Sequence, residues 1–210
     1  MSTNKMGIYR SRILPHLMNA VMNSDENQEI RSRVCTDLAG TVMEIGFGSG
    51  LNTPYYPKGV HIVHAVEPAA RSVALASERI KSSHALVHHT GLTGEHVDLP
   101  SASVDAVLST WTLCSIPDID AALSEIRRVL KPGGTLHLVE HGISPDQKVA
   151  RWQRLLEPIN KPISGGCHLT RDIPALLTSA GFVVTTMTTY QHPKEPKAFG
   201  WTFEGRAVPA

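Results

Sequence analysis

Hydrophobic and polar positions follow two different periods along this 210-residue chain, and the change of period marks the predicted elements. From Gly40 onward, short apolar runs rich in β-branched residues predict strands that are buried on both faces. These runs cover Thr41–Ile45, His61–Val66, Ala85–His89, Val104–Ser109, Thr135–Glu140, Val183–Tyr190 and Ala198–Val208. Between them, Ala69–Lys81 and Ile119–Leu130 carry apolar residues three and four positions apart, which predicts helices.

Strands that alternate with helices are typical of βαβ units. The pattern predicts an α/β fold, with a mainly parallel seven-stranded sheet and helices on both faces. The segment Lys131–Gly134 carries the stop signals of the second helix. Only His192–Lys197 separates the last two predicted strands, which is too short for a crossover between parallel neighbours. We therefore expect the last strand to pair antiparallel.

Two helical segments outside this alternation are predicted to cap the sheet. Ile8–Leu38 has the pattern of two helices that are broken near Asn23–Glu26, and Pro145–Arg171 repeats large apolar residues at helical spacing. Residues 1–39 are expected to form an N-terminal helical cap, and residues 40–210 the ligand-binding domain. A chain of this length suits one compact domain overall.

Composition and charge narrow the class of partner. The chain is 41% hydrophobic and 19% charged, with a formal net charge of +1, as in ordinary water-soluble proteins. Nucleic acid is not an expected partner, because Lys and Arg do not cluster. The three widely spaced cysteines argue against a disulfide framework, and we find neither a signal-peptide core nor a spanning apolar run. We expect a cytoplasmic monomer or homodimer.

A glycine-rich loop follows the first predicted strand, in the run from Glu44 to Gly50 (E-I-G-F-G-S-G). Glycine lets a backbone turn tightly and approach a ligand closely, although a tight turn without a ligand is the alternative. A dinucleotide fingerprint would need glycine where this chain has Leu51, and the phosphate-loop motif is absent. The Glu44 carboxylate disfavours a pyrophosphate and suits a cationic ligand.

An acidic residue, Glu67, ends the second predicted strand. The carboxyl edge of an open α/β sheet is where such folds bind ligands, and a carboxylate there can accept hydrogen bonds from both ribose hydroxyls. A solvated acid at a strand end is the alternative. The glycine loop about twenty residues upstream favours the ribose interpretation.

The motifs E-I-G-F-G-S-G, A-V-E-P, G-E-H-V-D-L-P-S-A-S-V-D-A-V and R-V-L-K-P-G-G-T-L resemble the class I S-adenosylmethionine-dependent methyltransferases, in particular UbiE-like domains. The resemblance covers Gly40 to about His141. It implies a Rossmann-like fold, S-adenosylmethionine as cofactor and S-adenosylhomocysteine as product. The cofactor-binding positions that it implies are Glu44, Gly46, Gly48 and Gly50 for methionine, Glu67 for ribose, Pro68, Gly94, Glu95 and His96 around adenine, and Thr110 along the cofactor.

Other pieces, including T-L-C-S-I, E-H-G, R-W-Q-R-L-L-E-P and G-G-C-H-L-T-R-D, are similar to the methyltransferase-like thiol S-methyltransferases of animal membranes. Those proteins carry an N-terminal hydrophobic anchor, and no such anchor or membrane-spanning segment is expected here. The resemblance implies a small-molecule acceptor.

Methyl transfer from a sulfonium needs alignment and a free lone pair more than a dedicated acid or base. His141, after the fifth predicted strand, is the candidate general base or substrate-orienting residue, and a structural histidine is the alternative. The candidate substrate-binding residues are Trp111, Leu113, Trp152, Cys167 and His168, of which the first three are apolar and favour an apolar acceptor. Cys114, His141, Cys167 and His168 could gather around zinc, but without a C-x-x-C pair no metal is expected.

These observations predict an S-adenosylmethionine-dependent methyltransferase that acts on a small apolar molecule such as a thiol, phenol, quinone or lipid-like compound. Two alternatives remain open at this point. One is a catalytically silent S-adenosylmethionine-binding protein, and the other is an NAD-dependent oxidoreductase, which Leu51 and Glu44 disfavour.

Overall fold

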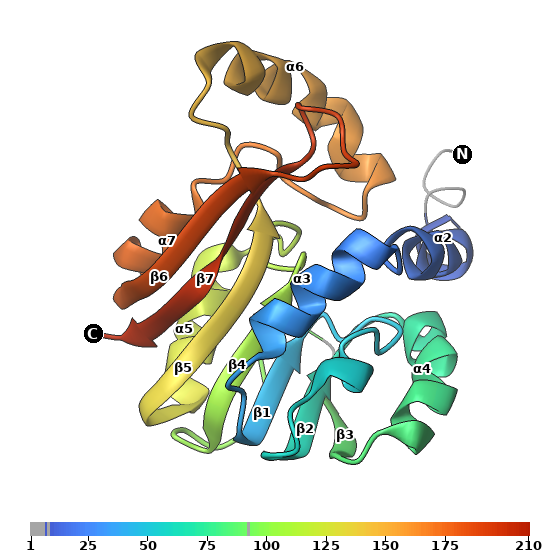
Figure 1. Ribbon diagram of the computed structural model, residues 1–210, viewed down its shortest axis with the longest axis vertical. Helices are drawn as coiled ribbons and strands as arrows, with labels where there is room; N and C mark the ends of the chain where they lie inside the picture. Colours follow the sequence, from blue (N-terminus) through green and yellow to red (C-terminus); the bar gives the residue numbers. More distant parts are fainter. Residues whose placement is uncertain (1–6, 8, 92) are drawn as a thin grey trace.

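The computed structural model describes residue 7, residues 9–91 and residues 93–210. Its core is a seven-stranded sheet in the order β3-β2-β1-β4-β5-β7-β6, with helices on both faces (Figure 1). The strands are β1 (Gly40–Ile45), β2 (Val60–Val66), β3 (Leu86–Gly91), β4 (Val104–Thr110), β5 (Leu130–His141), β6 (Phe182–Gln191) and β7 (Trp201–Pro209). The predicted α/β class is confirmed.

Strand direction also follows the prediction. The pairs β1–β2, β2–β3, β1–β4 and β4–β5 are parallel, whereas β7 lies between β5 and β6 and runs antiparallel to both. The strand order reverses between β1 and β4, and open α/β folds bind ligands at such a switch point.

Two predicted strand starts were wrong by several residues. The fifth strand was expected to begin at Thr135, but β5 already begins at Leu130, directly after α5 (Ile119–Val129), and Leu130 pairs with Val104 before a register shift in the ladder. The last strand begins at Trp201 rather than Ala198, because the chain turns at Pro196, whose carbonyl accepts from the amides of Phe199 and Gly200.

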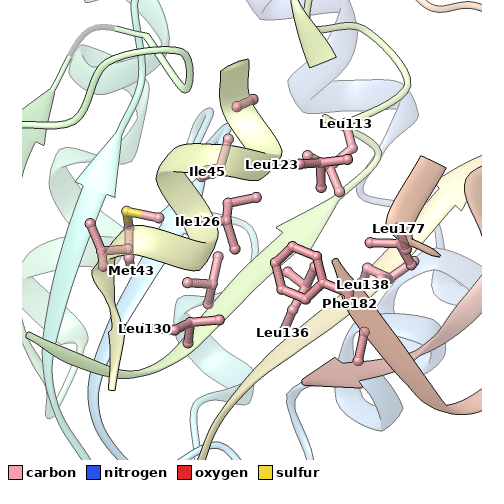
Figure 2. Close-up of a cluster of buried hydrophobic side chains, with 14 of the residues drawn as sticks. Met43, Ile45, Leu113, Leu123, Ile126, Leu130, Leu136, Leu138, Leu177 and Phe182 are labelled. Carbon is pink, nitrogen blue, oxygen red and sulfur yellow. The ribbon is translucent and has the colours of Figure 1, made fainter. Parts of the chain in front are cut away.

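Alternate residues of the strands pack on opposite faces, as a two-residue period requires. Met43 belongs to the cluster covered by α5 (Ile119–Val129) and α7 (Ile173–Ser179), part of which is drawn in Figure 2. Val42 belongs to the cluster on the opposite face, beneath α3 (Asp25–Cys35). The helix α4 (Ala70–Ser82) packs against the sheet with its residue Ala76, which clusters with Ala65 of β2. The central strands are thereby buried on both faces, whereas many residues of the edge strands β3 and β6 are exposed.

The N-terminal region folds as the predicted pair of helices. A π-helical turn, η1 (Tyr9–Ile13), leads into α2 (Leu14–Val21), and α3 starts after Ser24, whose hydroxyl accepts from the Asn27 amide. The break lies within the predicted segment. The expected start of the first helix, Ile8, lies outside the described residues.

The second predicted cap is α6 (Gln147–Ile163), and its orientation differs from the expectation. Its buried residues are Ala150, Gln153 and Asn160, whereas Trp152 is 58% exposed on the outer side. Gln153 is buried because its amide bridges the Ser144 N–H and the Gly142 carbonyl. Among the described residues, no helix combines the length and apolar character needed to cross a bilayer.

Candidate active site

A cavity of about 410 Å³ opens where β1, β4 and β5 end at the carboxyl edge of the sheet. The glycine loop lines one side, through Gly46 and Gly48, and the ends of β4 and β5 line another, through Thr110 and His141. Residues of α2 and the end of α6 close it from above; they include Met18, Val21, Met22, Asn160 and Ser164. Both predicted caps therefore contribute to the site.

The glycine loop adopts a backbone that side chains would resist. Gly46 has φ of +72°, and a Cβ built there would lie 1.9 Å from the Thr112 hydroxyl. Gly48 also has positive φ, but a Cβ there would meet nothing nearer than the Gly46 carbonyl at 3.7 Å. Gly46 is therefore required by close packing, while Gly48 leaves space open beside the cavity.

Glu67 ties this loop to the end of β2. Its carboxylate accepts hydrogen bonds from the Gly48 N–H at 2.9 Å and from the Ala69 N–H at 2.7 Å. Burial raises the pKa of Glu67, while these two hydrogen bonds oppose the rise. The two motifs that the sequence singled out thus meet in one hydrogen-bonded unit, although Glu67 itself does not line the cavity.

Glu44 lies beneath the loop rather than in the cavity wall, and it is 1% exposed. Its carboxylate accepts hydrogen bonds from the Asn52 side-chain amide at 2.9 Å and from the Tyr56 hydroxyl. Burial raises the pKa of Glu44 to about 7, with the hydrogen bonds from Tyr56 and Asn52 and the charge of Arg31 limiting the rise. Glu44 supports the floor of the site.

Sequence reasoning missed a buried cation, Arg31 on α3, that lines the cavity. Its guanidinium donates to Asn52 Oδ1 at 2.7 Å and to Thr110 Oγ1 at 3.2 Å, and it lies 4.9 Å from the centre of the Trp111 ring. Burial lowers the pKa of Arg31 to about 10. A signal existed, since Arg31 lies four positions before the buried Cys35 and therefore on the same helix face.

The opposite wall of the cavity brings together three residues from distant parts of the chain. The Cys167 sulfur lies 3.5 Å from the Cys114 sulfur and 3.7 Å from His141 Nδ1. His141 Nε2 faces Glu195 Oε2 at 3.4 Å. Burial lowers the pKa of His141, but its contacts with Cys114 and Glu195 outweigh this and raise the pKa overall.

Trp111 joins the two walls and has an unusual backbone. Its φ is +52°, a conformation that bulky side chains rarely adopt and that is often found at functional sites. Its ring centre lies 6.4 Å from that of His141, and its indole N–H is buried without a hydrogen-bond partner among the described residues. The indole is held between Arg31 and His141 at the cavity.

Comparisons with known proteins fit this geometry. The methyltransferase domain family matches residues 43–138. Thiol S-methyltransferase TMT1B of Homo sapiens is 30% identical over 209 residues, covering 92% of this chain and 85% of that protein. The Rattus norvegicus protein of the same name is 33% identical over 185 residues, or 84% and 73% of the two chains. The chain belongs to the class I S-adenosylmethionine-dependent methyltransferases.

A solved structure agrees with this assignment at the level of the fold. An S-adenosylmethionine-dependent methyltransferase of Thermotoga maritima, described as a possible histamine N-methyltransferase, superposes with a TM-score of 0.68. Sequence identity is 20%, and the match covers 98% of this methyltransferase and 99% of that chain. Family and fold together imply S-adenosylmethionine as the cofactor.

Several predicted site residues of this methyltransferase lie elsewhere. Residues that do not line the cavity include Gly50, Pro68, Gly94, Glu95, His96, Leu113, Trp152 and His168. Leu113 is fully buried in the core against α5, because its backbone is held by Glu140 and its side chain faces the other way. His168 pairs with Glu157 at 3.3 Å instead. Cys167, Trp111 and Thr110 do line the cavity.

Proposed function

We propose that this methyltransferase transfers the methyl group of S-adenosylmethionine to the sulfur of a small apolar thiol. The observation that carries the proposal is one cavity that joins the glycine loop to a wall of apolar side chains, two cysteines and a histidine. The likeness to the two thiol S-methyltransferases supports sulfur as the acceptor atom. S-adenosylmethionine, when bound, supplies a methyl group made electrophilic by its sulfonium.

The cofactor side of the cavity fits that molecule. The space beside Gly48 is open, and the Glu67 carboxylate lies directly behind it, where it could exchange its bond to the Gly48 N–H for ribose hydroxyls. Arg31 offers a buried positive charge for the methionine carboxylate, and its Nε has no hydrogen-bond partner within the described part of the chain. Glu44 does not line the cavity itself. The Asn52 side-chain amide donates to Glu44 and to Thr110, and thereby links Glu44 to a residue of the cavity wall.

The acceptor side is suited to a small molecule without charge. Its apolar lining comprises Met18, Val21, Met22, Trp111, Leu169 and Phe199. These side chains exclude water from the path of the methyl group, which favours a weakly solvated nucleophile such as a thiolate. His141, at the end of β5, is placed to orient the acceptor sulfur.

A matched pair of acceptors tests the proposal. Purified protein is incubated with S-adenosylmethionine and either benzyl mercaptan or benzyl alcohol, and S-adenosylhomocysteine is measured by mass spectrometry. We expect product with the thiol and none above background with the alcohol. Product only with a phenol or a hydroquinone would show that oxygen is the nucleophile. Cofactor binding without product from any acceptor would indicate a silent binding protein.

A further inference from the structure

Three metal-ligating side chains converge in the acceptor wall. Cys114 follows β4, His141 ends β5, and Cys167 lies in the loop after α6. Their donor atoms all lie within 4.8 Å of one another. No C-x-x-C spacing marks this group in the sequence, because each residue comes from a different segment.

Two of the three distances between these atoms match a tetrahedral metal site, and the third pair, Cys114 Sγ and the His141 ring nitrogen, lies within 4.8 Å. With Zn–S of about 2.3 Å and Zn–N of about 2.0 Å, tetrahedral ligands lie roughly 3.4 to 3.8 Å apart. The Cys167 sulfur lies 3.5 Å from the Cys114 sulfur and 3.7 Å from His141 Nδ1. A disulfide would need the two sulfurs at about 2.05 Å, so they are separate thiols here.

The backbone around the two cysteines is fixed by hydrogen bonds. Glu140 accepts from the Cys114 N–H at 3.0 Å, and the Cys114 carbonyl accepts from the His168 N–H at 2.8 Å. The Asn160 side chain donates to the Cys167 carbonyl at 3.0 Å. Cys114 is 1% exposed and Cys167 is 7% exposed. The group is therefore held in place before any ligand arrives.

The histidine lies between a cysteine and a carboxylate. His141 Nδ1 faces Cys167, and its Nε2, which makes no hydrogen bond among the described residues, lies 3.4 Å from Glu195 Oε2. A carboxylate on the far nitrogen of the ring is the common partner of a metal-ligating histidine. Glu195 also lines the cavity, so this partner belongs to the same site.

We propose that Cys114 Sγ, Cys167 Sγ and His141 Nδ1 bind one Zn²⁺ ion, with its fourth position open to the cavity. Two thiolates and one neutral imidazole suit zinc, and three protein ligands with an open position are typical of a catalytic rather than a structural zinc site. Glu195 positions the histidine.

The role of the ion rests on the proposed function. An acceptor thiol takes the open position as a thiolate and releases its proton to solvent. A lone pair of that sulfur then forms the bond to the methyl carbon while the carbon–sulfonium bond breaks. The products are a thioether and S-adenosylhomocysteine, and no oxidant or reductant is consumed. The ion keeps the thiol ionised inside an apolar cavity, where burial would otherwise favour the neutral form.

Zinc binding is measured without turnover. The full chain is kept in a metal-free phosphine reductant, titrated with Zn²⁺ against a chromophoric chelator and, after dialysis, assayed by mass spectrometry for bound metal. We expect one zinc per chain. C114S and C167S should lose it, while C35S should retain it, because Cys35 is a buried cysteine in the cluster on the other face of the sheet. E195Q should bind about 10 to 100 times more weakly.

A second measurement does not depend on the folding of a variant. Wild-type protein titrated with Co²⁺ should develop thiolate-to-cobalt charge-transfer absorption that saturates at one ion per chain and disappears when Zn²⁺ is added. The proposal fails if wild type retains no zinc, if C114S and C167S retain as much as wild type, or if the freshly purified chain carries a Cys114–Cys167 disulfide. Full-rate methylation by zinc-free protein would overturn the role of the ion. Zinc binding without thiol methylation would count against the proposed function alone.

Discussion

The two walls of the cavity are built in different ways. The motif on the cofactor side comes from neighbouring stretches of chain, since the loop after β1 and the end of β2 meet through the bond from the Gly48 N–H to Glu67. The acceptor side is assembled from β4, β5, the loop after α6 and the segment before β7. A local motif can be recognised from its spacing, whereas an assembled wall can be recognised only from the fold.

The largest effect is expected on the cofactor side, at Gly46. G46A places a methyl group 1.9 Å from the Thr112 hydroxyl in a backbone with φ of +72°, and strained backbone alone costs about 1 to 3 kcal/mol. We expect S-adenosylhomocysteine binding, measured by calorimetry, to be lost. G133A is the matched control, because Gly133 has a similar positive φ of +78° with no atom within 4 Å of its Cβ and does not line the cavity, so it should bind more tightly than G46A. Equal binding by the two variants would contradict the packing argument.

Removing the Glu67 carboxylate should have the next largest effect. E67A removes the acceptor of the Gly48 and Ala69 N–H groups and of the proposed ribose bonds. With about 1.5 to 3 kcal/mol for a hydrogen bond to a charged group, cofactor affinity should fall about 100-fold. E78A is the control, because Glu78 is exposed on α4 and pairs with Lys81. An equal loss in both variants would mean that the loss does not come from the bonds of Glu67.

Glu44, in the floor of the site, should make the free energy of unfolding depend on pH. The pKa of Glu44 is about 7 in the folded chain and near 4.5 when unfolded, so the folded state holds the proton more tightly. Its contribution to stability is complete below pH 4.5 and is lost as pH rises through 7, by about 2 kcal/mol between pH 5 and 7. Denaturant unfolding of wild type and E44Q isolates this contribution. Parallel curves for the two proteins over this range would refute it.

Arg31 should matter for affinity more than for folding. R31M keeps much of the side-chain volume but removes the buried charge proposed to face the methionine carboxylate. We expect cofactor affinity to fall about tenfold, which corresponds to about 1.4 kcal/mol. R33M is the control, because the Arg33 charge is half exposed and paired with Glu204 at 2.8 Å. If R33M weakens binding as much as R31M, the effect is not local to the cavity.

The smallest effect is expected at Trp152. W152S alters a side chain that is 58% exposed on the outer side of α6 and does not line the cavity. The free energy of unfolding should change by less than about 0.5 kcal/mol, and the KM for the thiol should stay the same. W111F, inside the cavity, should raise that KM. A raised KM in W152S would mean that the acceptor approaches along α6.

The residues that were predicted well share a short-range cause. The two-residue period of the backbone predicts the strands, and a capping residue predicts the break at Ser24. The glycine loop lies next to Glu67 because both belong to one βαβ unit, which spans about thirty residues. The outward face of α6 was predicted wrongly for the opposite reason. Its apolar period identifies a helix, but the buried hydrogen bonds of Gln153 decide which side faces inward.

By itself, therefore, the sequence determined the α/β class, the antiparallel last strand and the loop that carries the cofactor motif. Only the tertiary structure decided that Arg31 enters the cavity and that Cys114, His141 and Cys167 converge. The physical reason is separation along the sequence, because dihedral preferences and periodicity act between near neighbours in the chain. The acceptor wall is instead formed by the ends of distant segments, which come together only when the sheet and α6 pack.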